Sequence, residues 1–249
     1  MDLGLEGTAA LVTGASKGIA RGVAAELVRE GARVAVSSRS RERIDATAAE
    51  IGATGFVHDS SDLDAVPGLL ERVEGAIGPL DVLVLSTGGP PAGPDALGFS
   101  RAAWEDAYRE LVLAPMALIE RVLPGMRERG FGRVVNVSSS AVREPLPVLM
   151  LSNTHRSALL AGFKTLARQV AGDGVTLNSV LPGKILTDRL VAGAGSREAA
   201  VRNAADEVPA GRPGTVEEIA GVAAFLCSAR AGYVTGTALL VDGGLTHAV

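Results

Sequence analysis

The sequence predicts a three-layer α/β fold, in which a seven-stranded parallel sheet carries helices on both faces. Two observations support this: short apolar and β-branched runs alternate with longer stretches of helical period, and a glycine-rich turn joins the first run to the first helical stretch. A parallel sheet needs cover on both faces, and right-handed crossovers then place helices above and below it. We therefore expect one doubly wound domain over residues 1–249.

The expected elements follow one another as strand, turn and helix. The strands are expected at residues 9–13, 33–37, 55–58, 82–85, 133–138, 175–180 and 238–241. The helices are expected at residues 19–30, 41–51, 63–77, 104–129, 151–171 and 215–228. Two stretches fit poorly: residues 88–100 are rich in Pro and Gly, and residues 187–210 hold mostly small and charged side chains. We interpret residues 187–210 as a mobile helical lid, with an ordinary surface insertion as the alternative.

Composition excludes several classes of protein. The net charge is −4 and the basic residues are scattered, which argues against a nucleic-acid surface. No apolar run is long enough to span a membrane, and the amino terminus does not resemble a secretory signal. Cys227 is the single cysteine and only three histidines occur, so no metal-ligand spacing is present. We expect a cytoplasmic protein with no metal, whose partners are small molecules.

The glycine-rich turn is the clearest chemical signal. Residues 13–20 read TGASKGIA. Glycine permits a tight turn and a close approach of the backbone to a pyrophosphate, whose charge then meets the amino terminus of the helix. Glycines also serve simple turns, but this place between the first strand and the first helix favours a nucleotide site. The candidate cofactor-binding residues of the turn are Gly14, Ser16, Lys17, Gly18 and Ile19.

The end of the second strand indicates which nucleotide is bound. Proteins that bind NAD usually place an acid there to hold the ribose hydroxyls, whereas residues 37–40 read SSRS. Ser38, Arg39 and Lys17 would instead surround a 2′-phosphate, so we expect NADP(H) in preference to NAD(H). The alternative is that both cations are solvated surface residues. Asp59, after the third strand, either accepts the adenine amino group or merely begins a turn.

Further motifs extend along nearly the whole chain. Residues 81–84 read DVLV, 132–139 GRVVNVSS, 182–187 PGKILT, 211–214 GRPG, 233–236 YVTG and 241–244 VDGG. Together with the turn at 13–20, these segments resemble the short-chain dehydrogenase/reductases, particularly the branch of 3-oxoacyl-carrier-protein reductases. The resemblance implies a Rossmann fold and an oxidoreductase. It also implies cofactor contacts from Ser86, Thr87, Gly88, Pro182, Gly183, Ile185 and Thr187.

Members of that family use a tetrad of Tyr, Lys, Ser and Asn, of which the resemblance implies that this chain keeps only the Ser. In the family, Tyr exchanges a proton with the substrate oxygen, while Lys lowers the pKa of that Tyr and holds the nicotinamide ribose. Ser139 matches the family's Ser, whereas Ser152, Arg156 and Leu111 stand where Tyr, Lys and Asn are expected. Ser152 has no accessible acid pKa, so we expect ordinary tetrad chemistry to be lost. Arg156 would still present a cation to the ribose.

Two neighbouring residues are candidates to replace the missing proton donor. His155 lies within one turn of Ser152 on the expected helix, and histidine is a common acid–base side chain, with a partly exposed helix residue as the alternative. Lys184 either faces the nicotinamide, binds a substrate carboxylate or phosphate, or points to solvent. Our catalytic candidates are therefore Ser139, Ser152, His155 and Arg156.

Two functions of different classes remain at this point. One is an NADP(H)-dependent oxidoreductase of a carbonyl or an alcohol, with the proton coming from His155, Lys184 or water. The other is a binding or regulatory protein that keeps the nucleotide pocket and has lost its chemistry, for example as a partner of an active family member. The resemblance also implies a homotetramer or homodimer built on the expected helices 104–129 and 151–171, with contacts from residues 241–244.

Overall fold

Seven apolar segments form strands in the computed structural model, which describes residues 2–248. They are β1 (Ala9–Thr13), β2 (Arg33–Ser38), β3 (Thr54–Val57), β4 (Val82–Ser86), β5 (Gly132–Val137), β6 (Val175–Pro182) and β7 (Ala238–Val241). All neighbouring strands are parallel, in the order β3-β2-β1-β4-β5-β6-β7. The predicted doubly wound parallel sheet is therefore confirmed.

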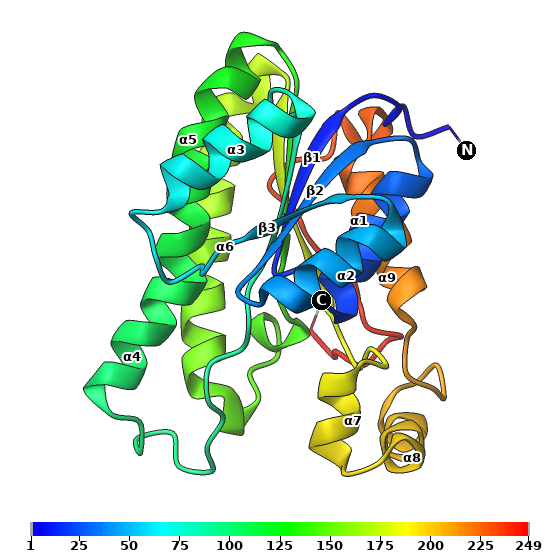
Figure 1. Ribbon diagram of the computed structural model, residues 1–249. Coiled ribbons are helices and arrows are strands. Elements are labelled where there is room, and N and C mark those ends of the chain that lie inside the picture. The colour runs from blue at the N-terminus through cyan, green and yellow to red at the C-terminus, as the bar shows by residue number, and fades with distance from the viewer. Residues whose placement is uncertain (1, 249) are drawn as a thin grey trace.

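Helices cover both faces of this sheet (Figure 1). They are α1 (Gly18–Arg29), α2 (Arg41–Ile51), α3 (Val66–Ile77), α4 (Arg101–Tyr108), α5 (Ala114–Glu128), α6 (Met150–Val170), α7 (Asp188–Ala194), α8 (Arg197–Glu207) and α9 (Val216–Cys227). One buried apolar cluster joins the sheet to α1, α2 and α9, and a second joins the opposite face to α3, α5 and α6. The apolar strands thus separate two cores, as burial on both faces of a parallel sheet requires.

The expected single helix over residues 104–129 is divided in the structure. It begins earlier, where the Ser100 hydroxyl caps α4 by accepting a hydrogen bond from the Ala103 amide at 3.2 Å. A turn of π-helix, Arg109–Leu113, then separates α4 from α5. Pro115, in the first turn of α5, explains the break, because a proline has no N–H and its ring collides with the carbonyl four residues back. That carbonyl belongs to Leu111.

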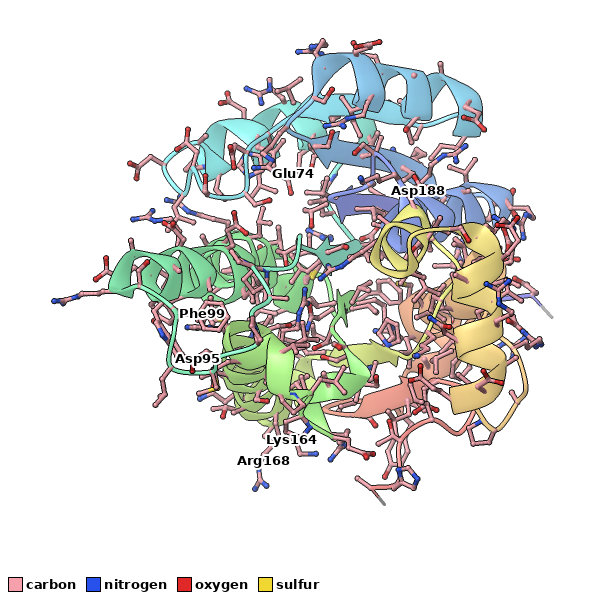
Figure 2. The ribbon with its side chains drawn as sticks, turned by 90° about the horizontal axis from the view of Figure 1, so that it is seen from below. Glu74, Asp95, Phe99, Lys164, Arg168 and Asp188 are labelled. Carbon is pink, nitrogen blue, oxygen red and sulfur yellow. The ribbon has the colours of Figure 1, made fainter. Side chains whose placement is uncertain are left out.

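The carboxyl ends of the strands meet at one edge of the sheet, which lies at the bottom of Figure 1 beside α7 and α8. Figure 2 looks onto this edge and shows the loop with Asp95 and Phe99 on one side and α7 with Asp188 on another. Residues 88–100 form neither helix nor strand, whereas the stretch 187–210 contains α7 and α8. The helical part of the lid prediction agrees with the structure, and its mobility stays a prediction. Within residues 2–248, no helix is long and apolar enough to cross a membrane.

We expect replacement of Gly14 by Ala to destabilise the protein by about 1–3 kcal/mol, because its φ of 63° lies in the left-handed region and an added methyl group would collide with the Ser86 carbonyl. Urea unfolding measures the loss. The matched control is Gly162→Ala in α6, where no neighbouring atom obstructs a methyl group and a gain of about 0.5–1 kcal/mol is expected. Equal effects at the two positions would contradict the prediction.

Candidate functional site

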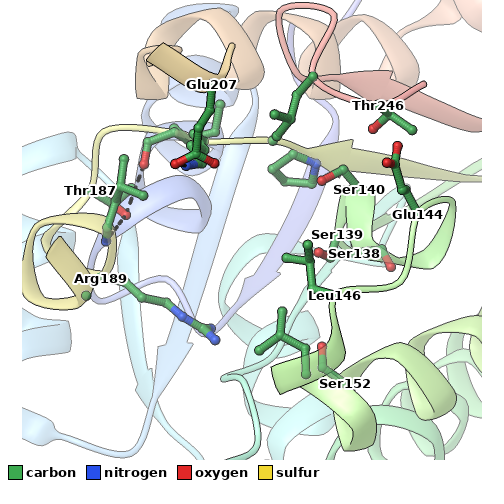
Figure 3. Close-up of a pocket in the computed structure, with 18 of the residues that line it drawn as sticks. Ser138, Ser139, Ser140, Glu144, Leu146, Ser152, Thr187, Arg189, Glu207 and Thr246 are labelled. Atoms are coloured by element: carbon green, nitrogen blue, oxygen red, sulfur yellow. Dashed lines mark hydrogen bonds and ion pairs between the residues drawn. The ribbon is translucent and has the colours of Figure 1, made fainter. Parts of the chain in front are cut away.

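Two cavities lie among the loops at the carboxyl edge of the sheet. The smaller, of about 410 Å³, is lined by Gly14, Ser16, Lys17, Ser38, Arg39, Arg43, His58, Asp59, Ser60, Ser86, Thr87, Gly88 and Glu110. The larger, of about 860 Å³, has walls from α6, α7, α8, the end of β6 and the segments after β5 and β7 (Figure 3). The Rossmann topology places ligands in such a crevice, on the side where the strand order reverses between β1 and β4.

The turn after β1 forms one wall of the smaller cavity. Gly14 and Gly18 both have positive φ, which lets the backbone reverse before α1 begins. The Ala15 amide donates to the Ser37 carbonyl at 3.0 Å, and Thr47 Oγ1 donates to the Ser16 carbonyl at 3.2 Å, so the turn is tied to β2 and α2. No side chain caps the amino terminus of α1. Its first amide groups therefore remain available for an anion.

The structure brings Lys17, Ser38 and Arg39 together in the smaller cavity, together with Arg43, which the sequence analysis did not single out. Arg43 lies in the first turn of α2, which Ser40 caps, with the Arg43 amide donating to Ser40 Oγ at 3.3 Å. Three cations thus line one small space. Arg43 belongs to the helix after the motif, where a solvated arginine is the ordinary expectation.

Asp59 fits both of its proposed interpretations. It begins a turn, because its Oδ1 accepts hydrogen bonds from the Ser61 amide at 2.9 Å and the Ser61 hydroxyl at 2.8 Å, and it also lines the smaller cavity. These hydrogen bonds, with a smaller contribution from the Arg39 charge, lower the pKa of Asp59 below its usual value. Asp59 is therefore an anion and an acceptor at neutral pH.

Ser139 and Ser152 both line the larger cavity, where Figure 3 shows them on the same wall. Ser139 follows β5 and caps a short 3₁₀ turn, with its Oγ accepting a hydrogen bond from the Ala141 amide at 3.2 Å. Ser152 lies in the first turn of α6, and its Oγ accepts from Arg156 Nε at 3.2 Å. Each hydroxyl keeps its own proton to donate.

Arg156 is a buried cation that joins the two cavities. Its Nη1 donates to the Val137 carbonyl and its Nη2 to the Gly88 carbonyl, each at 3.2 Å, so it connects α6 with β5 and with the loop after β4. Only 6% of the residue is exposed. This desolvation, with a smaller contribution from the nearby charge of Arg189, lowers the pKa of the Arg156 guanidinium to about 10. Arg156 is still a cation at neutral pH.

His155 lies on a different side of α6. Its ring packs against Trp104 and Tyr108, at centroid distances of 5.4 and 6.1 Å, and its Nδ1 lies 2.8 Å from the Leu151 carbonyl. It is buried, contrary to the alternative of a partly exposed residue, and it lines neither cavity. A proton donor must come within hydrogen-bond reach of the substrate, so this placement does not favour His155. Leu111 is also buried, within the π-helical turn.

The segment from Pro182 to Thr187 forms the wall of the larger cavity between β6 and α7. It is fixed by two backbone hydrogen bonds, from the Leu186 amide to the Gly214 carbonyl and from the Gly214 amide to the Lys184 carbonyl. The Thr187 hydroxyl also accepts from the Leu190 amide and caps α7. Pro182, Gly183, Ile185, Thr187 and Ile19 all line this cavity. Lys184 lines it too, but its Nζ pairs with Glu207 of α8 at 2.5 Å.

Several lining residues were not identified by sequence reasoning. Glu144 accepts a hydrogen bond from the His247 amide at 2.7 Å, and its other oxygen lies 3.2 Å from His247 Nδ1. Arg189 extends from α7 into the larger cavity (Figure 3). Neither feature has a local sequence signal, because residues 144 and 247 are distant in the chain and Arg189 lies in a stretch of ordinary charged residues. Within residues 2–248, no group of three or more His, Cys, Asp or Glu side chains is placed to hold a metal.

Comparisons with known proteins agree with this geometry. Residues 14–246 match a family model described as enoyl-(acyl carrier protein) reductase. The 3-oxoacyl-[acyl-carrier-protein] reductase of Haemophilus influenzae is 32% identical over 97% of this chain and 99% of its own. The L-sorbose reductase of Gluconobacter frateurii, solved with NADPH and L-sorbose, superimposes with a TM-score of 0.95 at 30% identity, covering 100% of both chains. An actinorhodin polyketide ketoreductase solved with NADPH gives 0.91 at 30% identity, covering 96% and 97%.

Replacement of Arg156 by Lys is expected to make the stability depend on pH. The burial that lowers the pKa of the guanidinium would also lower that of an ammonium, below its usual value of about 10.4. The folded variant then loses its proton at a lower pH than the unfolded chain. The free energy of unfolding of the variant should therefore rise relative to that of the parent between about pH 7 and about pH 10.

Urea unfolding of both proteins at a series of pH values measures this difference, and the other titrating groups cancel in the comparison. A difference that stays constant with pH would mean that water reaches the ammonium group, and would contradict the desolvation of this site.

Proposed function

Because the chain belongs to the short-chain dehydrogenase/reductase family, we propose that it is an NADP(H)-dependent oxidoreductase acting on a carbonyl or alcohol group. The observation that carries the proposal is the smaller cavity, where Lys17, Arg39 and Arg43 surround the end of β2 and no acid follows that strand before α2. Cations at this place suit the 2′-phosphate of NADP. The two NADPH-bound structures similar to this chain support the same cofactor.

The residues present fit such a cofactor. The Gly14–Ser86 contact leaves room only for glycine in the turn, and the uncapped amino terminus of α1 is suited to a diphosphate. We assign Gly14, Ser16, Gly18 and Ile19 to the diphosphate. Lys17, Ser38, Arg39 and Arg43 are assigned to the 2′-phosphate, and Asp59 to the adenine. Toward the nicotinamide end we assign Ser86, Thr87, Gly88, Pro182, Gly183, Ile185 and Thr187.

The nicotinamide would supply or accept the hydride, and the chain's own residues would bind and polarise the substrate. Ser139 is proposed to donate a hydrogen bond to the substrate oxygen, and Arg156 to hold the cofactor ribose and place positive charge beside the reaction. Ser152 fixes Arg156 through the Oγ–Nε hydrogen bond. Of the proton sources considered, His155 is turned away and Lys184 is paired with Glu207. Water in the open cavity is therefore the proposed source.

A second function is favoured by one observation: the Ser152 hydroxyl already accepts a hydrogen bond from Arg156 Nε. If Ser152, Arg156 and Leu111 replace Tyr, Lys and Asn, the chain is a binding or regulatory protein with a lapsed active site. The combined variant Ser152→Tyr, Arg156→Lys, Leu111→Asn separates the two functions. A gain of NADPH-dependent ketone reduction over the parent supports a lapsed site, and slower reduction than the parent supports a different native chemistry.

We further propose that the protein forms a homotetramer or homodimer through α4, α5 and α6, with contacts near β7. Tyr108 at the end of α4 and Tyr233 before β7 are exposed aromatic side chains, which are common at interfaces. Light scattering at several protein concentrations would test this, and a monomer at all of them would contradict it.

Replacement of Arg39 by Gln should weaken NADPH binding by about tenfold or more, because one charged hydrogen bond to a phosphate is lost. NADH, which lacks the 2′-phosphate, should bind the variant as it binds the parent. Fluorescence titration of both dinucleotides measures both affinities. The matched control is Arg41→Gln, since Arg41 lies on α2 outside the cavity, where it pairs with Asp45.

An equal loss of NADPH and NADH affinity would show that Arg39 does not recognise the 2′-phosphate. Failure of the parent to bind either dinucleotide would overturn the proposed function altogether.

A further inference from the structure

The charges that line the larger cavity do not cancel. Its cations are Arg156, Lys184 and Arg189, and its acids are Glu144 and Glu207. Both acids are already engaged, Glu207 by Lys184 and Glu144 by His247. Among residues 2–248, no carboxylate lies within ion-pair distance of Arg156 or Arg189. The cavity's arginine and lysine side chains therefore exceed its carboxylates by one positive charge.

The burial of Arg156 makes this surplus positive charge energetically unfavourable. A guanidinium removed from water is normally compensated by an acid, whereas Arg156 is 6% exposed and has only hydroxyl and carbonyl partners. It has five N–H groups, three of which are used in those hydrogen bonds. One N–H on each terminal nitrogen therefore remains to be satisfied. An unpaired buried cation of this kind is a frequent feature of ligand sites.

Arg189 approaches the same point from the other side of the cavity. Its guanidinium lies so close to Gly89 that any side chain there would collide with it, and Arg156 donates to the adjacent Gly88 carbonyl. Figure 3 shows Arg189 reaching inward from α7, opposite the wall that carries Ser139 and Ser152. Two like charges are thus held near one glycine pair, an arrangement that an anion placed between them would relieve.

We propose that Arg156 and Arg189 together bind the carboxylate of a short oxo acid, or of the corresponding hydroxy acid, as the substrate of this site. Arg189 offers the paired N–H donors that a carboxylate accepts, and Arg156 adds one of its two remaining N–H groups while the other serves the cofactor ribose. A single surplus charge matches a carboxylate better than a dianionic phosphate. Leu146, Leu149 and Leu190 line the same cavity and suit a short aliphatic chain. This inference rests on the proposed function.

The reaction implied by this substrate balances. Reduction adds one hydride from the nicotinamide to the carbonyl carbon and one proton from water to the oxygen, giving the hydroxy acid and the oxidised cofactor. Ser139 would face the carbonyl while the two arginines hold the carboxylate. The guanidinium groups would thus recognise the substrate without taking part in proton transfer.

Binding of oxo acids in the presence of saturating NADP⁺ tests the proposal, because no reduction occurs with the oxidised cofactor. The probes are pyruvate, 2-oxobutanoate, acetoacetate and 4-oxopentanoate, each compared by calorimetry with its own methyl ester. We expect at least one acid to bind about tenfold or more tightly than its ester. Arg189→Met should remove that preference, and Arg189→Lys should retain part of it. Arg202→Met on α8, an exposed arginine outside the cavity, is the matched control and should change nothing.

Three results would overturn the proposal. The first is that no acid binds better than its ester, and the second is that dihydroxyacetone phosphate binds while no carboxylate does. The third is that Arg189→Met weakens NADP⁺ binding and leaves the acid unaffected, which would assign Arg189 to the cofactor phosphates. The same titrations without cofactor separate this proposal from the proposed function. If the protein binds neither dinucleotide but still prefers the acid through Arg189, only the proposed function is refuted.

Discussion

The parallel pairing of β1 with β4 is the constraint on which the site depends. These strands are distant in sequence, and their register brings the end of β1 level with the end of β4. There Thr13 Oγ1 accepts a hydrogen bond from the Ser86 amide at 3.0 Å, and Gly14 passes directly against the Ser86 carbonyl. The turn before α1 and the loop after β4 are thereby fixed to each other. Two of the segments that line the smaller cavity are held together by this contact.

Arg156 extends the same arrangement to the larger cavity, and comparison with Arg133 shows what distinguishes it. Arg133 is equally buried, but its guanidinium donates to the carbonyls of Ser228, Gly132 and Gly174 and lies 4.2 Å from the Phe131 ring centre. It lines neither cavity, so its role is to join β5 to the residue after α9 and to the residue before β6. Arg156 has similar carbonyl partners, but it opens onto a space that can hold a ligand. Burial alone therefore does not mark a functional cation, whereas burial at a cavity wall does.

The sequence predicted the layers and the order of elements because strand and helix periods are local properties of the chain. All seven strands and the glycine turn lie within a residue or two of their expected positions. The stretch around Leu111 is not the single helix that its period predicts, because Pro115 interrupts the helical hydrogen bonds. The direction of side chains is harder to predict from the sequence. The spacing of His155 and Ser152 permits a shared helix face, but packing against Trp104 turns the imidazole away from the larger cavity. The Glu144–His247 and Lys184–Glu207 contacts are long-range pairings with no local signal.

If Ser152 stands in place of the family's phenol, the charge of Arg156 also bears on how the proposed reaction would proceed. Hydride addition to a carbonyl leaves negative charge on the oxygen, and fixed positive charge in a partly enclosed cavity stabilises that oxygen more strongly than water does. Arg156 needs no proton transfer to have this effect, because it stays protonated at neutral pH. The nearby Ser139 hydroxyl adds a hydrogen-bond donor. On the proposed function, such a site would replace acid catalysis by electrostatic stabilisation, and protonation by water would follow. Replacement of the family's tyrosine would then change the order of hydride addition and protonation without abolishing the reduction.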